Sequence, residues 1–398
     1  MNRSARNAWL VTMTTALLAA ATARAEEPKA AAAPLPAAAA PAAAAPAPAA
    51  AAPAAPAAVS EPAKPAPKWY DELQFNAFVS AGFNQNLSGA RVNRLRVFDG
   101  AANTFSIGVA ELVLQKPVAN TGDVGFRFDL DFGGVIPGLS VFPGDPVGLR
   151  QAFVSWIAPV GSGLRLDFGK MITLHGFEYI ETFDNPNDNY SRSLLFGYAI
   201  PFTHTGVMAT YSFSPKLRAI LQVVNGWDAE TSQQNGKTIC AQLNATPTDT
   251  ISLYGNYCGG IETVSGAHVT RHLVDLNGTV KLTPWLTVGV NGDYGTDTGA
   301  AAGDTAWYGA ALYLKAESES GMGLALRGEY FKDRDGARTG SKVAASEVTV
   351  TPYVKINSRL LVRLEGRIDV ADSAYFTGGD GKPSSSQATV ALNTAFTY

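Results

Sequence analysis

The stretch EVTVTPYVKINSRLLVRLEGRIDV, residues 347–370, contains two segments in which apolar and polar side chains alternate. In the second segment Arg363, Glu365 and Arg367 share one face, whereas Leu364 and Ile368 lie on the other. A period of two places the two sets on opposite faces of a β-strand. Only a short polar turn separates the segments, so together they predict a pair of antiparallel strands.

The same alternation recurs along the chain from residue 71 onward, and counting its segments predicts fourteen strands, with twelve or sixteen as alternatives. Bacterial membrane barrels have even strand numbers, which agrees with this count. The segment 103–116 is the weakest, because its alternation slips near Ala110 and Glu111. The predicted strands span residues 73–84, 103–116, 123–133, 148–158, 163–173, 202–213, 216–227, 268–282, 285–296, 305–317, 322–332, 346–356, 359–370 and 387–398.

Three features favour a membrane barrel over a water-soluble sandwich, which would also alternate. The segments are about 10 to 12 residues long, near the 9 to 11 that a tilted membrane strand needs and longer than the five or six of a typical soluble strand. Short and long connections follow one another in turn. Aromatic residues lie near strand ends, such as Trp156 and Trp285 beside short turns and Trp227 and Trp307 near long loops. We therefore predict an all-β, transmembrane, antiparallel up-and-down barrel over residues 71–398.

Composition excludes several other classes of protein. The chain has 398 residues, of which 46% are hydrophobic and 16% charged, whereas soluble domains carry about 25% charged residues. It lacks the repeated apolar stretches of about 20 residues that a polytopic helical membrane protein needs. The net charge of −3 argues against nucleic acid as a partner, since that normally requires a basic surface.

The N-terminal residues predict export. Arg3 and Arg6 precede a short apolar run that ends in Ala23-Arg24-Ala25, the pattern of a secretory signal peptide over residues 1–25. Residues 26–70 are rich in Ala and Pro, which cannot build a packed core. We expect this segment to be a disordered, extended periplasmic tether, and a role in binding the cell wall stays open.

The final segment alternates up to Phe396 and Tyr398. An aromatic residue at the end of an exported barrel resembles the C-terminal signal that the bacterial barrel-assembly machinery reads. We expect that machinery and outer-membrane lipid as partners.

Five segments of the predicted barrel form a set of motifs: Ala110–Pro117, Asp167–Lys170, His175–Glu178, Asn189–Ser193 and Pro201–Gly206. These motifs resemble those of the putative β-barrel porin-2 family, the OmpL-like outer-membrane porins. The resemblance covers residues 71–398 and implies an outer-membrane channel for small solutes, without specifying the solute.

One face of the predicted strands is rich in ionisable groups. An Arg or Lys facing lipid at mid-membrane costs about 2–4 kcal/mol, so these groups are expected to face the lumen. Opposed charges there could select solutes, or they could form a paired ladder that only stabilises the interior. The candidate pore-lining residues are Arg127, Asp129, Asp131, Arg165, Asp167, Arg218, Arg327, Glu329, Arg363, Glu365, Arg367 and Asp369.

A long connection over residues 174–201 is a candidate constriction loop. We hypothesise that it folds into the lumen with Asp188, Tyr190 and Arg192 near the narrowest point. The alternative is an ordinary extracellular loop.

Cys240 and Cys258 lie in the longest predicted connection, residues 228–267. In an exported chain they are expected to form a disulfide that staples this surface loop, contributing about 3 kcal/mol with no redox role.

His175, Glu178 and His204 match no known metal motif and are interpreted as polar residues at strand ends. We therefore expect no metal site and no cofactor.

The sequence thus predicts a porin in the outer membrane of a Gram-negative bacterium, through which small hydrophilic solutes or ions diffuse passively. The alternative is a closed barrel that serves as an anchor or a surface-interaction protein. We expect no enzyme activity, because Ser or Thr next to His along a strand points to the opposite face and forms no triad. Association into a homo-oligomer stays open.

Overall fold

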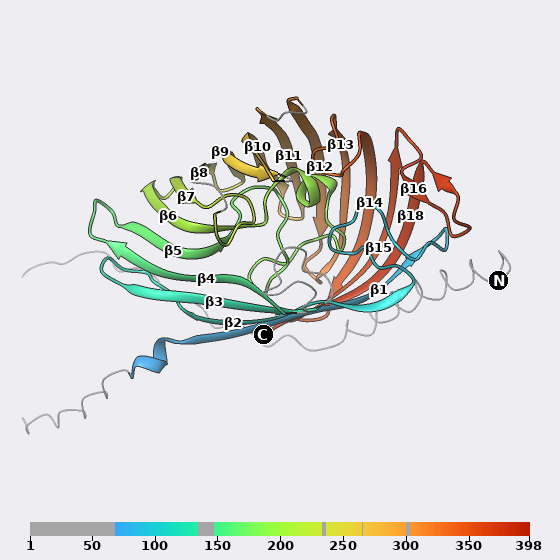
Figure 1. Cartoon of the computed structure of the whole chain (residues 1–398). Helices are drawn as coiled ribbons and strands as arrows, with labels where there is room; N and C mark the ends of the chain where they lie inside the picture. Colours follow the sequence, from blue (N-terminus) through green and yellow to red (C-terminus); the bar gives the residue numbers. More distant parts are fainter. Residues whose placement is uncertain (1–67, 134–146, 233–235, 265, 300–302) are drawn as a thin grey trace, which may run out of the picture. The chain divides into compact units, whose positions relative to one another are not determined.

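The computed structural model shows a closed antiparallel β-barrel of sixteen strands (Figure 1). Each strand pairs with its neighbours in sequence, and β1 pairs with β18 to close the sheet. The predicted signal peptide and the predicted tether up to residue 67 lie outside the described residues. The structure describes residues 68–133, 147–232, 236–264, 266–299 and 303–398.

The barrel strands are β1 (Gln74–Asn86), β2 (Thr104–Lys116), β3 (Val124–Phe132), β4 (Val147–Ala158), β5 (Leu164–Ile172), β6 (Thr203–Ser214), β7 (Leu217–Val224), β8 (Thr238–Thr248), β9 (Ile251–Val264), β10 (Ala267–Thr283), β11 (Leu286–Thr298), β12 (Thr305–Glu317), β13 (Met322–Asp333), β14 (Val343–Lys355), β15 (Leu360–Ala371) and β18 (Ser386–Thr397). A short hairpin of β16 (Phe376–Thr377) and β17 (Pro383–Ser384) lies in the connection before β18. The short helical elements are η1 (Trp69–Glu72) and η2 (Leu195–Ala199). No helix in the described part of the chain is long and apolar enough to cross a membrane.

The predicted class is confirmed, but the count of fourteen strands is too low by two. The missing strands are β8 and β9, which occupy most of the connection predicted over residues 228–267. Their outward positions include Ala241, Gly255 and Gly259 between larger residues such as Leu243. Small side chains on the lipid face weaken the apolar alternation, so the sequence pattern there resembles that of a loop.

The slip in the alternation of β2 has a local cause. The pairing with β1 shifts register where Ser80 pairs with Val109 and Ala81 with Ile107, which leaves Gly108 as an extra residue. Such a bulge exchanges the inward and outward positions on its two sides. Phe105 therefore faces outward before the bulge, whereas Val113 is fully buried after it.

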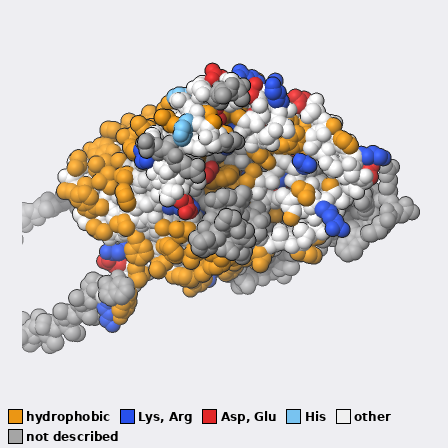
Figure 2. Space-filling model, viewed as in Figure 1, with side chains coloured by type: hydrophobic (Ala, Val, Ile, Leu, Met, Phe, Trp, Pro, Cys, Tyr) orange, Lys and Arg blue, Asp and Glu red, His pale blue; other side chains and the backbone are white. Residues whose placement is uncertain are grey.

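The outer surface of the barrel carries many exposed apolar side chains, among them Phe105, Phe168 and Leu276. Figure 2 shows hydrophobic side chains gathered at the left and lower edge of the view, where Figure 1 places β2–β6. Large contiguous apolar surface of this kind is tolerated where lipid covers it.

The main hydrophobic cluster lies inside the barrel. It includes Leu195 and Phe196 of η2 together with Trp307 of β12 and Phe331 of β13. The indole nitrogen of Trp307 donates a hydrogen bond to the carbonyl of Ala199, 3.0 Å away. The connection between β5 and β6 is therefore packed against the inner wall, and we call its residues 173–202 the inner loop.

Candidate functional site

The inner loop contacts strands from separate parts of the wall (Figure 1). The side-chain amide of Gln242 on β8 donates to the carbonyl of Leu174 at 3.0 Å. The backbone N–H of Phe183 donates to Glu111 on β2 at 3.0 Å. Because β2 and β8 are far apart in the strand order, the loop crosses the interior of the barrel.

Arg327 of β13 fixes the middle of the loop. Its guanidinium lies 2.6 Å from Glu178 of the loop and 2.6 Å from Glu347 of β14. It also donates to the carbonyl of Ser191 at 2.8 Å. Arg327 is buried, so these partners, together with the hydroxyl groups of Ser191 and Thr349, must stabilise its charge in place of water.

Two arginines of β15 hold neighbouring parts of the loop. Arg363 pairs with Glu181 at 2.8 Å and donates to the carbonyl of Asn187 at 2.7 Å. Arg367 pairs with Asp369 at 2.6 Å and donates to the carbonyl of Arg192, also at 2.6 Å. Each arginine thus joins a carboxylate to the backbone of the loop.

Two buried carboxylates of β13 and β15 also accept hydrogen bonds from loop N–H groups. Glu365 accepts from Tyr190 at 2.6 Å and from Ser191 at 3.0 Å. Glu329 accepts from Leu194 and, at 3.1 Å, from Leu195. Hydrogen bonds to charged groups are the stronger kind. We call the surface of β13–β15 that makes these contacts the arginine wall: Arg327, Glu329, Glu347, Arg363, Glu365 and Arg367.

Strands β3–β5 carry a second group of the predicted charges. Arg127 lies 2.8 Å from Asp129 and 2.6 Å from Asp184 of the inner loop. Asp131 pairs with Arg150 at 2.5 Å. A further pair joins Arg165 and Asp167 at 3.0 Å. Arg150, which sequence analysis missed, also donates to two loop carbonyls, those of Ile180 and Glu181.

Strands β8–β11 carry one ion pair among the described residues, between Arg271 and Asp297 at 2.7 Å. Across β8–β11 the inward side chains form a row in which Gln242 donates to Asn256 at 2.8 Å and Asn291 donates to Asp275 at 2.7 Å. Asn256 also donates to Asp275, which joins the two halves of the row. We call Gln242, Asn256, Asp275 and Asn291 the amide wall.

A cavity of about 560 Å³ lies between the inner loop and the inward faces of β7–β13. Its lining combines apolar side chains with hydroxyl and amide groups, and its charged members are Glu178, Asp188, Arg218 and Lys315. Lys315 and Asp188 pair at 2.7 Å, and their side chains are 33% and 40% exposed. Arg218 is exposed and forms no ion pair with any described residue.

Of the three residues predicted for a constriction, Asp188 alone lines this cavity. Tyr190 and Arg192 instead border a small cavity of about 40 Å³ on the side of β3 and β4. Arg192 is buried and donates to loop carbonyls, including that of Tyr179 at 2.9 Å. Sequence analysis missed Lys315, although the alternation of β12 places it on the inward face beside Tyr313.

The ionisation of loop groups follows their surroundings. Burial acts to raise the pKa of Glu181, but the charges of Arg363 and Arg192 outweigh it and hold this pKa below its usual range. The pKa of Asp184 is likewise lowered, because its hydrogen bond and ion pair with Arg127 outweigh burial. Burial lowers the pKa of His175 to about 4, so this imidazole is neutral at pH 7.

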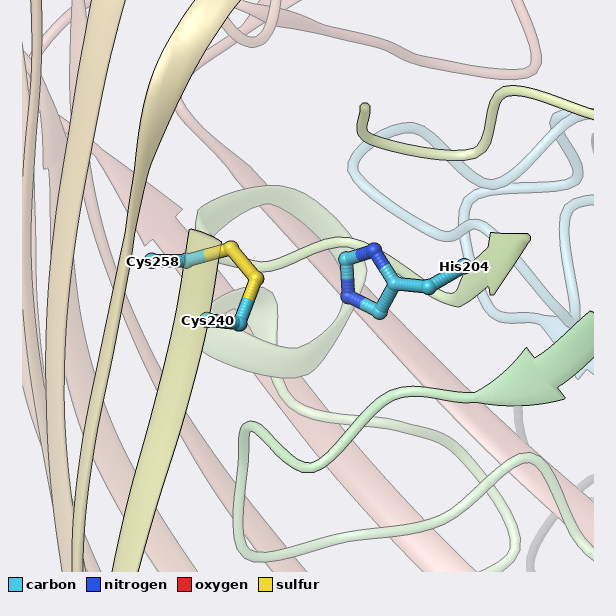
Figure 3. A group of neighbouring side chains, drawn as sticks. All are labelled: His204, Cys240 and Cys258. Atoms are coloured by element: carbon cyan, nitrogen blue, oxygen red, sulfur yellow. A yellow bond between two sulfur atoms is a disulfide. The ribbon is translucent and has the colours of Figure 1, made fainter. Parts of the chain in front are cut away.

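The two cysteines are joined by a disulfide, but they do not lie in a surface loop (Figure 3). Cys240 on β8 is directly opposite Cys258 on β9, and both side chains are fully buried. The prediction of a loop staple is wrong because the residues around each cysteine form barrel strands. His204, at the start of β6, points toward the disulfide.

Residues 72–398 match the model of the family described as putative beta-barrel porin-2, OmpL-like. The outer membrane channel DcaP of Acinetobacter baumannii has a similar structure, with a TM-score of 0.58 and 13% identity over 82% of this chain and 97% of that one. An anion-selective porin from Comamonas acidovorans has a TM-score of 0.59 and 10% identity over 82% of this chain and 99% of that one. OmpF of Salmonella typhi has a TM-score of 0.56 and 10% identity over 82% of this chain and 97% of that one. No curated protein matches the sequence.

Proposed function

The chain belongs to the putative beta-barrel porin-2, OmpL-like family, and from that premise we propose that its solutes pass between the inner loop and the inward faces of β7–β13. As a member of this family it is an outer-membrane porin of a Gram-negative bacterium, through which small hydrophilic solutes diffuse passively. Family and fold indicate a channel rather than an enzyme.

The observation that carries the proposed route is the cavity beside the amide wall. The inner loop packs against the arginine wall, and the arginines of this wall are buried. The cavity, in contrast, is bordered by uncharged polar groups such as Ser252 and Thr287. Hydrogen-bonding groups that line a water-filled passage let polar solutes move without tight binding.

The charges on the cavity lining favour a weak preference for anions. Arg218 and Lys315 are positive and Asp188 is negative, which leaves one net positive charge beside the passage. Glu178 also borders the cavity, but Arg327 neutralises it. A fixed charge at close range raises the local concentration of ions of the opposite sign.

Reversal potentials in a planar bilayer under a KCl gradient test this route. The full chain is expected to show stable single-channel openings and a weak anion preference. Arg218→Gln and Lys315→Gln should each move the reversal potential toward cations, whereas Arg334→Gln, a change in an exposed external ion pair, should not. Equal reversal potentials for all three variants would contradict the proposed passage.

The inner loop is proposed to set the width of the passage. Deletion of residues 182–192 would remove Asp188 and most contacts with the arginine wall. We expect a higher conductance and passage of larger polymers for this variant. Unchanged conductance and polymer exclusion in a folded barrel would show that the loop does not limit the channel.

Two further partners are proposed from the surface. The exposed apolar side chains on the outer surface of the barrel, including Phe168, are proposed to contact outer-membrane lipid. Phe396 near the end of β18 and Tyr398 just after it are 43% and 57% exposed, and we propose that the barrel-assembly machinery recognises this aromatic C-terminal end. Phe396→Ala should lower the amount of assembled barrel in cells, whereas Phe168→Ala should have a smaller effect.

A further inference from the structure

Cys240, Cys258 and His204 form a compact group inside the barrel (Figure 3). Their sulfur atoms and one imidazole nitrogen lie within 4.8 Å of one another. All three side chains are fully buried. They come from three strands, β8, β9 and β6, so the sheet itself positions them.

The hydrogen bonding of His204 determines its tautomer. Its Nδ1 lies 3.2 Å from the backbone carbonyl of Gly226. A carbonyl can only accept, so Nδ1 carries the proton and donates it. The Nε2 atom then has a free lone pair, and this buried atom has no hydrogen-bond partner among the described residues. Buried polar atoms are nearly always satisfied, and metal-binding histidines are oriented by this kind of Nδ1–H bond to a carbonyl.

A second buried histidine lies beside the group. The ring of His175 is 6.4 Å from that of His204, centroid to centroid. Its Nε2 is also buried and lacks a partner in the described part of the chain. His175 borders the cavity of about 560 Å³, so it connects the group with the proposed solute passage.

We propose that the reduced form of this group is a zinc site, with Cys240, Cys258 and His204 as ligands and His175 as the fourth. Two thiolates and two imidazoles are a donor set that Zn²⁺ takes in tetrahedral sites. Two thiolates also balance the two positive charges of the ion, as a buried position requires. The proposal is independent of the channel function.

Zinc and the disulfide exclude each other, because a thiolate is needed for the metal bond. A dithiol reductant breaks the S–S bond, supplies two electrons and two protons, and is itself oxidised to a disulfide. The two Cys thiols then lose their protons to solvent as two S–Zn bonds form. The group therefore has two states, a disulfide and a zinc-bound dithiolate.

Co²⁺ is the probe for the test, because its thiolate complexes absorb in the near ultraviolet and tetrahedral Co²⁺ absorbs in the visible. The full chain is folded in detergent, reduced with a phosphine and titrated with Co²⁺, and heat-dependent migration on a gel confirms folding. The reduced protein is expected to bind one Co²⁺ with both absorptions, which Zn²⁺ then displaces. The oxidised protein and Cys240→Ser/Cys258→Ser should show neither.

Substitution of the histidines distinguishes this site from metal bound by two thiols alone. His204→Ala and His175→Ala should each weaken Co²⁺ binding by at least about tenfold. His268→Ala, which changes an exposed histidine on β10, is the matched control and should not. The proposal is overturned if reduced, folded protein lacks the absorptions, if His204→Ala binds like the parent, or if the reduced chain fails to fold with Co²⁺ present. Unchanged binding in His175→Ala would overturn its place as the fourth ligand.

Discussion

The arginine wall and the amide wall face the same lumen, but they use opposite chemistry. On the arginine wall, Arg327, Arg363 and Arg367 are buried and each contacts both a carboxylate and a loop carbonyl. On the amide wall, neutral side chains such as Gln242 and Asn291 are linked in a row. The arginine wall holds the inner loop in place, whereas the amide wall contributes Gln242 to the lining of the cavity of about 560 Å³.

The difference shows that charge in a barrel lumen has two separate uses. Buried, fully paired charges fix geometry, because removing one partner leaves the other unpaired in a low-dielectric interior. Exposed charges such as Arg218 are free to act on mobile ions, which is the role proposed above for the cavity lining. A count of inward charges cannot separate these uses, whereas burial and pairing can.

Among the substitutions that compare the two walls, removal of Arg327 should lower the free energy of unfolding the most. Arg327→Met leaves Glu178 and Glu347 buried without their shared partner. We expect a loss of about 3–5 kcal/mol in the free energy of unfolding, measured as a lower urea midpoint in lipid vesicles. Arg334→Met, which breaks an exposed ion pair, should lower the free energy of unfolding by no more than about 1 kcal/mol. Equal midpoints for the two variants would show that the arginine wall does not hold the structure.

A smaller effect is expected when only the acceptor charge of Glu365 is removed. Glu365→Gln weakens its hydrogen bonds from the N–H groups of Tyr190 and Ser191. Loss of hydrogen bonds to a charged group costs about 1.5–3 kcal/mol. Hydrogen exchange should become faster at residues 189–193, and the barrel strands should stay protected. No change at these residues would exclude Glu365 as an anchor of the loop.

Acid should loosen the same contacts without mutation. Because the pKa of Glu181 is lowered in the folded protein, its contribution to stability is complete above its usual pKa of about 4.3 and is lost as pH falls through the lowered value. We expect larger current fluctuations toward pH 3 than at pH 7. Glu181→Gln should show such fluctuations already at pH 7. Steady currents from the parent near pH 3 and from this variant at pH 7 would contradict the role of Glu181 in holding the inner loop.

The smallest effect on stability, with a clear effect on transport, is expected on the side of the cavity. Lys315→Gln removes a half-exposed charge that pairs with Asp188. The free energy of unfolding should change by about 0.5 kcal/mol or less, while the relative permeability to anions falls. A stability loss as large as that of Arg327→Met would mean that Lys315, like Arg327, holds the structure together and is not a charge that acts mainly on solutes.

Periodicity predicted most of the fold, because lipid on one side and polar lumen on the other impose an alternation that can be counted. It failed at β8 and β9, where Ala241 and Gly255 stand on the lipid face. The shift of register at Gly108 disturbed the count in the same way but left enough apolar residues to mark a strand.

The candidate site was predictable by residue type but not by role. The inward face of Arg363 and Glu365 follows from alternation, yet their partners in the inner loop lie more than 170 positions away along the chain. Nothing local in the sequence indicates such pairs. Lys315 was missed because a single lysine in an apolar strand carries no motif, and only the position of the loop gives it importance.

The long sequence separation of these contacts has a consequence for the order of assembly. Tyr190 meets Glu365 across 175 positions, and Leu194 meets Glu329 across 135. Contacts between distant positions form late, since closing large loops costs entropy before any contact repays it. The inner loop belongs to the first half of the chain, but it cannot complete its contacts until β13 and β15 are in place. The inner loop therefore packs into its final position only after most of the barrel strands have assembled. In an assembly intermediate that lacks β13–β18, the loop would not yet occupy the lumen.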